Sequence, residues 1–127
     1  MIPEGQESII SITSRGAAPA DLNDSWLAVL RIEFDDVDPD ELAPSEFENE
    51  LVQLSQQQAT EIAEFVLEKA LISTTLVVHC KFGQSRSPAV AKAICEHFRI
   101  DFPPEFKSHN KFVHNLVFNA ISRHSGA

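Results

Sequence analysis

Cysteine and basic residues are both scarce in this 127-residue chain. The two cysteines, Cys80 and Cys95, are too few for a disulfide framework or for a structural zinc site built from four thiolates. Ten lysines and arginines stand against nineteen aspartates and glutamates, so the formal net charge is −9. Because such a chain repels the phosphates of nucleic acids and the surfaces of anionic membranes, we expect neither as a partner.

Long hydrophobic runs are also missing from the sequence. No apolar stretch approaches the ~20 residues that a membrane-spanning helix needs, and the N-terminal MIPEGQESII lacks the basic region and apolar core of a secretion signal. We therefore expect a cytoplasmic location.

Apolar residues nevertheless make up 43% of the chain, without an internal repeat or a low-complexity tract. A chain of this length and composition can bury a hydrophobic core, which predicts a single domain over residues 1–127. We expect this domain to be a monomer.

Strands are predicted where β-branched and apolar residues cluster between turn residues, at 8–14, 26–34 and 74–80. In the second of these, Leu30, Ile32 and Phe34 should share one face. The third has the composition of a strand buried on both faces.

Helices are predicted where apolar residues recur at helical spacing. Ser45 and Glu48 predict a capping box at the start of a first helix that reaches about residue 71, with a break near residues 55–57. A second helix is expected at 87–98, and a third follows the Pro103–Pro104 pair. The third carries an apolar stripe of Phe112, Val113, Leu116, Val117, Ala120 and Ile121. The alternation predicts an α/β fold with a central, mostly parallel sheet flanked by helices.

The most informative stretch is His-Cys-Lys-Phe-Gly-Gln-Ser-Arg-Ser, residues 79–87. It lies between a predicted strand and a predicted helix, and open α/β sheets bind ligands beyond the carboxyl ends of their strands. Backbone N–H groups of such a loop can turn toward an anion, and the dipole of the following helix adds positive potential. Gly83 relaxes the backbone inside the curve, and Arg86 can offer two parallel N–H donors that match phosphate oxygens.

The same electrostatic field would stabilise a thiolate at Cys80 and lower the pKa of this cysteine from about 8.5 into a range of about 3.5–7.5. The Ser87 hydroxyl could donate to that thiolate and later help it leave, whereas His79 is expected to organise the loop from behind. Phosphate bound above the sulfur would be placed for in-line attack and a cysteinyl-phosphate intermediate. The alternative interpretation is that Cys80 is an inert thiol at a strand end, which is the role we expect for Cys95.

These nine residues match His-Cys-x-x-Gly-x-x-Arg-Ser at every fixed position, so the stretch resembles the signature loop of the cysteine-based protein tyrosine and dual-specificity phosphatases. The short chain is similar to the compact dual-specificity group and to small tyrosine phosphatases of bacteria and phages. The acidic segment upstream and HNKFVHNLVFNAI at 109–121 extend the resemblance more weakly.

The resemblance implies a compact dual-specificity-phosphatase-like fold and a phosphorylated protein or peptide as substrate, without metal or another cofactor. It implies Cys80 as the nucleophile, Arg86 as the phosphate clamp and Ser87 as the group that assists thiolate departure. The backbone N–H groups that cradle the phosphate oxygens would come from Lys81, Phe82, Gly83, Gln84, Ser85 and Arg86.

The mechanism of that family also needs an aspartate upstream of the cysteine to protonate the leaving oxygen. RIEFDDVDPD at 31–40 offers Asp35, Asp36, Asp38 and Asp40. Comparison of the apolar strand positions with those of the family favours Asp36, with Asp35 next. The spacing from Asp36 to the cysteine is longer than is usual in the family, which requires an insertion between them.

Other functions remain as alternatives. A non-catalytic phosphate-binding or phosphoprotein-binding module would keep the loop and lack the acid. A rhodanese-like sulfurtransferase also holds a cysteine in an anion-binding loop, but it does not usually combine Cys-x5-Arg-Ser with an upstream acid. Low-molecular-weight tyrosine phosphatases carry their loop near the N-terminus, and lipid phosphatases tend to have further basic residues where this chain has Gln84.

Overall fold

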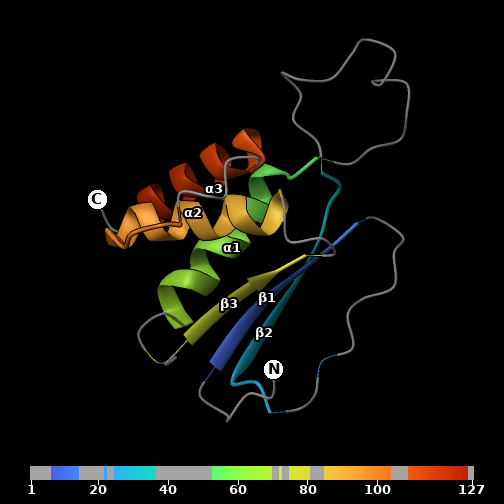
Figure 1. Ribbon diagram of the computed structural model, residues 1–127, viewed down its shortest axis with the longest axis vertical. Helices are drawn as coiled ribbons and strands as arrows, with labels where there is room; N and C mark the ends of the chain where they lie inside the picture. Colours follow the sequence, from blue (N-terminus) through green and yellow to red (C-terminus); the bar gives the residue numbers. More distant parts are fainter. Residues whose placement is uncertain are drawn as a thin grey trace.

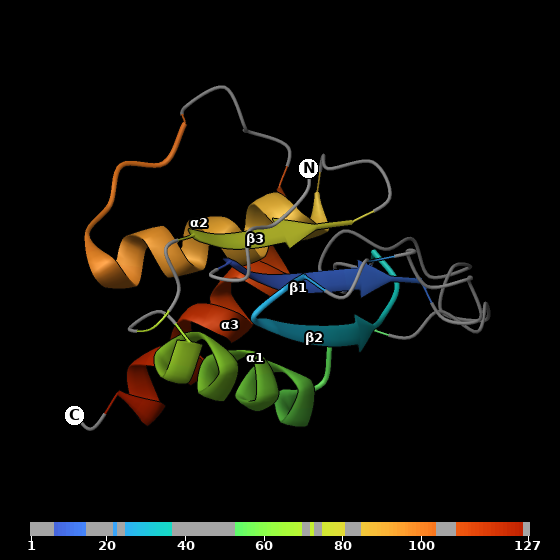
Figure 2. The same cartoon turned by 90° about the horizontal axis from the view of Figure 1, so that it is seen from below.

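The structure of the chain is a computed structural model, and it describes residues 7–14, 22, 25–36, 53–69, 72, 75–80, 85–103 and 109–125. Within these residues three parallel strands form one sheet in the order β2-β1-β3, with bounds β1 Glu7–Thr13, β2 Ala28–Glu33 and β3 Thr75–His79. The three arrows point the same way in Figure 2. The predicted α/β class and the parallel sheet are therefore confirmed.

Three helices lie together on one face of this sheet (Figures 1 and 2): α1 Gln56–Lys69, α2 Arg86–Phe98 and α3 Lys111–His124. Helix α3 packs against both α1 and α2. The buried side chains between the helices and the sheet include Ile10, Ile12, Ile32, Phe34, Leu54, Ile62, Val66, Val90, Val113, Val117 and Ile121. None of the helices in the described part of the chain is long and apolar enough to cross a membrane.

Helix α1 begins at a capping box that the sequence interpretation overlooked. The Ser55 hydroxyl accepts the Gln58 backbone N–H at 3.0 Å, and the Gln58 side-chain oxygen accepts the Ser55 N–H at 3.1 Å. The predicted break at residues 55–57 is thus the start of the helix, while the capping box predicted at Ser45 and Glu48 lies outside the described residues. The Gln58 amide also donates to the Glu33 carbonyl at 2.8 Å, which ties the start of α1 to the end of β2.

The prediction that the third strand is buried on both faces was wrong. In β1, residues 8–12 are all buried, whereas residues 76–79 of β3 are only half-buried. The reason is position: β1 has a strand on each side, and β3 lies at one end of the described sheet. The face shared by Leu30, Ile32 and Phe34 does point into the core, as predicted.

Candidate active site

The carboxyl ends of the three parallel strands meet at one edge of the sheet, where Ser14, Asp35–Asp36 and Cys80 follow β1, β2 and β3. Helix α2 begins at the same edge with Arg86. The structure therefore brings both ends of the predicted loop, and two of the predicted acids, to one place. Four loop residues, Lys81, Phe82, Gly83 and Gln84, lie outside the described residues, as do Asp38 and Asp40.

Cys80 faces the first turn of α2. Its Sγ lies 3.3 Å from Ser87 Oγ and 3.4 Å from the Ser87 backbone nitrogen, which donates its N–H to the sulfur. A backbone N–H at a helix N-terminus is a donor without a partner in its own helix, and it favours negative charge on the atom that it meets. Ser87 thus supplies two polar contacts to the sulfur, one of them through a hydroxyl that can reverse its donor direction.

The Arg86 side chain is buried, with 6% of the residue exposed. Its Nη1 donates to Phe34 O at 2.8 Å and to Ser14 Oγ at 2.9 Å, and both acceptors are uncharged. The ion pairs among the described residues are Lys69–Glu68 and His114–Glu96, so no described carboxylate neutralises this guanidinium. Both Nη1 hydrogens are used by these two bonds, and Nη2 and Nε carry the three remaining N–H groups.

Asp36 is exposed, yet its carboxylate is tied to the loop. Oδ1 accepts the Ser85 hydroxyl at 2.8 Å and the Asn110 side-chain amide at 2.9 Å. Asp35, the other described candidate, is half-buried. Of these two acids, Asp36 is therefore the one that is bonded to Ser85, next to the buried arginine.

Asn110 is a part of this site that the sequence interpretation missed. Its backbone N–H donates to the Ser85 carbonyl at 3.1 Å, and its side-chain oxygen accepts the Val113 N–H at 3.1 Å as the N-cap of α3. An asparagine before an apolar helical stripe is a recognisable cap signal, but nothing local indicates its bond to Asp36.

His79 holds the end of β3 against β1 from the side of the sheet away from the helices. Its Nε2 lies 2.7 Å from the hydroxyl of Ser11, which is its register partner on β1. Burial, together with the positive charge of Arg31, lowers the pKa of His79 below its ordinary value, so the neutral ring is favoured. His79 thus lies at the strand end that leads into the loop, and its supporting role stays a prediction.

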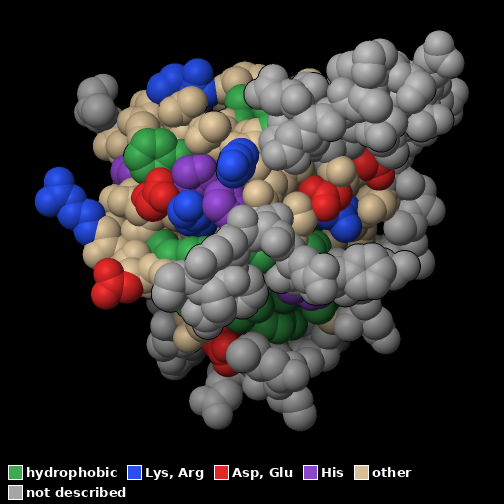
Figure 3. All heavy atoms as spheres, turned by 45° about the horizontal axis from the view of Figure 1, so that its top comes forward, with side chains coloured by type: hydrophobic (Ala, Val, Ile, Leu, Met, Phe, Trp, Pro, Cys, Tyr) green, Lys and Arg blue, Asp and Glu red, His purple; other side chains and the backbone are tan. Residues whose placement is uncertain are grey.

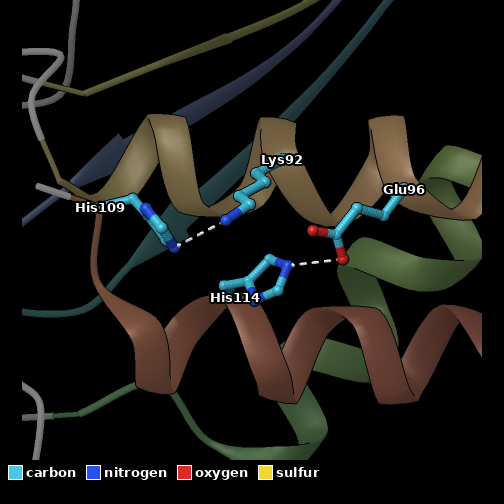
Figure 4. Close-up of polar contacts among 4 residues, drawn as sticks. All are labelled: Lys92, Glu96, His109 and His114. Atoms are coloured by element: carbon cyan, nitrogen blue, oxygen red, sulfur yellow. Dashed lines mark hydrogen bonds and ion pairs between the residues drawn. The ribbon is translucent and has the colours of Figure 1, made fainter. Parts of the chain in front are cut away.

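Polar side chains also connect α2 with α3 close to the site (Figure 4). Lys92 Nζ lies 3.5 Å from His109 Nε2, and His114 Nε2 lies 3.0 Å from Glu96 Oε2. The His114 ring also stacks on Phe118. On the side that carries the helices, histidine, basic and acidic side chains adjoin one another (Figure 3). Since His109 directly precedes the cap of α3, these contacts help to hold that cap beside α2.

A pocket of about 410 Å³ lies between α2 and the end of β3. Val78 and His79 line it from β3, Ser87, Pro88, Ala91 and Cys95 line it from α2, and Phe102 and Pro103 close it. Burial raises the pKa of the half-buried Cys95, as does the nearby Glu96 charge, so this cysteine favours the neutral thiol. Because Ser87 and Cys95 are two helical turns apart, about 12 Å along the axis, Cys95 is not placed to form a disulfide with Cys80.

Comparisons of this chain with protein-family models, with curated proteins and with solved structures found no match. Among the described residues, no group of three or more histidine, cysteine, aspartate or glutamate side chains is arranged to hold a metal ion. The site itself combines a thiol, a buried guanidinium and a hydrogen-bonded carboxyl at the amino end of α2.

Proposed function

We propose that this chain is a cysteine-dependent phosphatase that hydrolyses phosphotyrosine, with phosphoserine and phosphothreonine as further substrates. The proposal includes a compact dual-specificity-phosphatase-like fold built around the parallel sheet and its three helices. The motif at residues 79–87 supports it, and so do the contacts of the residues at both ends of that motif.

The observation that carries the proposal is the environment of Arg86. A buried positive charge is costly unless a negative group compensates it, and the described partners of Arg86 are a carbonyl and a hydroxyl. An oxyanion bound in front of Nη2 and Nε would supply the missing negative charge through two parallel hydrogen bonds. The Cys80 thiol, which contacts Ser87 in the first turn of the same helix, is the proposed nucleophile.

In the first chemical step, the Cys80 thiolate attacks phosphorus and forms an S–P bond while the P–O bond to the leaving group breaks. Asp36 transfers its proton to the leaving oxygen, so that a phenol or an alcohol departs rather than its anion. Arg86 and the backbone N–H groups at the start of α2 stabilise the charge on the three phosphoryl oxygens.

In the second step, water attacks the phosphorus of the cysteinyl phosphate. The Asp36 carboxylate accepts a proton from this water, the S–P bond breaks, and inorganic phosphate is released. The departing thiolate is met by the Ser87 hydroxyl and by the Ser87 N–H, which lie 3.3 Å and 3.4 Å from Sγ. The enzyme is thereby returned to its starting state without oxidation or reduction.

The test is hydrolysis of p-nitrophenyl phosphate and of a phosphotyrosine peptide by freshly reduced protein, with a chelator present. We expect turnover by the wild type and none by Cys80→Ser, which keeps the size of the side chain and removes the thiolate. Turnover that survives in Cys80→Ser would exclude a cysteinyl-phosphate intermediate. A phosphothreonine peptide measured beside the phosphotyrosine peptide reports the breadth of specificity.

Two other results would point to the alternative functions. A wild-type protein that binds phosphate without hydrolysing either substrate would be a phosphate-binding module. A protein that transfers sulfur from thiosulfate to cyanide, and leaves phosphate esters intact, would be a sulfurtransferase.

A further inference from the structure

We infer that Asn110 is a positioning residue for the acid: its amide holds one oxygen of Asp36, so that the other oxygen carries the proton to the leaving group. The inference rests on the proposed function and adds a residue that lies outside the signature loop. It starts from the two donors that converge on Asp36 Oδ1, at 2.8 Å and 2.9 Å.

Because both donors meet Oδ1 of Asp36, they favour Oδ2 as the oxygen that carries the proton. A proton on Oδ1 would point at the Asn110 amide nitrogen, which can only donate, or would require the Ser85 hydroxyl to turn its own hydrogen away from that oxygen. The acid proton is therefore expected on Oδ2. The same bonds oppose a half-turn of the carboxyl group, which would exchange the two oxygens.

Asn110 is suited to this task because it is itself held on several sides. Its side-chain oxygen caps α3 through Val113, and its backbone N–H is bonded to the Ser85 carbonyl. Only 6% of the residue is exposed. Since the cap uses Oδ1, the amide nitrogen is left facing Asp36, and the orientation of the amide follows from both contacts.

Asp36, in contrast, is exposed and would be free to rotate without these bonds. The three groups that meet here come from the end of β2, the start of α2 and the cap of α3. Asn110 thus connects the placement of the acid to the packing of α3 against α2.

The experiment compares Asn110→Ser with the wild type on two substrates. Serine is as good an N-cap as asparagine, so the start of α3 is kept while the amide donor is lost. A phosphotyrosine peptide needs the acid because its leaving phenol has a pKa near 10, whereas p-nitrophenyl phosphate releases a more acidic phenol and needs it less. We expect kcat to fall about 10- to 100-fold on the peptide, the equivalent of one hydrogen bond to a charged group, and much less on p-nitrophenyl phosphate.

Two further variants separate positioning from a loss of stability. Ser85→Ala removes the other donor to the same oxygen and should give the same difference between substrates. Val66→Ala leaves a cavity in the second half of α1, away from the start of this helix that is tied to β2, and should weaken folding without altering the ratio of the two rates. The decline of kcat at high pH, which reports the protonated acid, should persist in Asn110→Ser and disappear in Asp36→Asn.

The outcomes are distinct. A selective loss on the peptide in Asn110→Ser and Ser85→Ala, but not in Val66→Ala, supports the inference. Equal rates on both substrates, or an equal fall on both, would overturn the role of Asn110 and leave the phosphatase function standing. A wild-type protein without turnover would overturn both.

Discussion

Replacing Arg86 with lysine keeps the positive charge and changes the number and direction of its donors. Two N–H groups of the guanidinium are bonded to Phe34 O and Ser14 Oγ, at 2.8 Å and 2.9 Å. A lysine ammonium has three donors, so after it replaces these two bonds one donor is left for phosphate, where arginine offers a planar pair. Losing one oriented donor to developing charge costs about 10²–10³ in kcat, or about 2.7–4 kcal/mol. We expect Arg86→Lys to lose at least that factor.

The assay is steady-state hydrolysis of a phosphotyrosine peptide by wild type, Arg86→Lys and the control Arg123→Lys, which changes an exposed arginine in the last turn of α3. Urea unfolding of each variant shows whether a lost rate reflects a lost fold. A second measurement, the affinity for inorganic phosphate with and without Arg86→Lys in the Cys80→Ser background, tests phosphate binding by Arg86 separately from catalysis. Turnover of Arg86→Lys within a few-fold of wild type, with the protein folded, would refute the assignment of this guanidinium to phosphate.

Three further predictions concern other groups of the site. Asp36→Asn should lower turnover of the peptide about 10²–10⁴-fold while Asp35→Asn changes it little, and the reverse order would transfer the acid role to Asp35. Because burial, and secondarily the charge of Arg31, lowers the pKa of His79, the unfolded chain binds this proton first as the pH falls. The contribution of His79 to the free energy of unfolding is therefore present above about pH 6.5, and it is lost as the pH falls through the lower pKa of the folded state. His79→Gln should reduce the difference between the urea unfolding midpoints measured at about pH 8 and at about pH 5. An unchanged difference would contradict this linkage. Cys95, whose pKa is raised mainly by burial, should react with iodoacetamide more slowly at neutral pH than Cys80. Alkylation of Cys95 before Cys80 would contradict this prediction.

Elements with a strong local pattern, and their combination into a parallel sheet with helices, could be predicted from the sequence, whereas the order of the strands in the sheet could not. The stripe that ends in Ala120 and Ile121 lies on one face of a single helix, and the structure buries both residues. The prediction that residues 74–80 form a strand buried on both faces failed because burial also depends on which strands neighbour one another. Residues 74–80 are more uniformly apolar, yet β1 with its two serines is the strand enclosed on both sides. Ser8 and Ser11 are 0% and 1% exposed, and the bond from Ser11 to His79 shows how a small hydroxyl can be buried there.

The same contrast holds for the candidate site, whose loop could be predicted from the sequence and whose supporting contacts could not. The loop was visible in the sequence because its cysteine, arginine and serine stand on one short segment of chain. Its supporting contacts were not visible, because they join positions that are far apart. Arg86 is 72 residues from Ser14 and 52 residues from Phe34, and Asn110 is 74 residues from Asp36. Such contacts arise from the meeting of strand ends and helix starts, for which a single sequence holds no periodic signal.

The charges at this edge of the sheet are compatible with the roles proposed for Arg86 and Asp36. The chain has nearly twice as many acidic as basic residues, and still no described carboxylate pairs with Arg86. If Asp36 formed that pair, the guanidinium would be less available to a phosphate, and its positive charge would favour the anion of the carboxyl over the proton-donating form. The bonds from Ser85 and Asn110 give Asp36 neutral partners instead. In the proposed chemistry, this arrangement leaves Arg86 for the phosphate and Asp36 for the leaving oxygen.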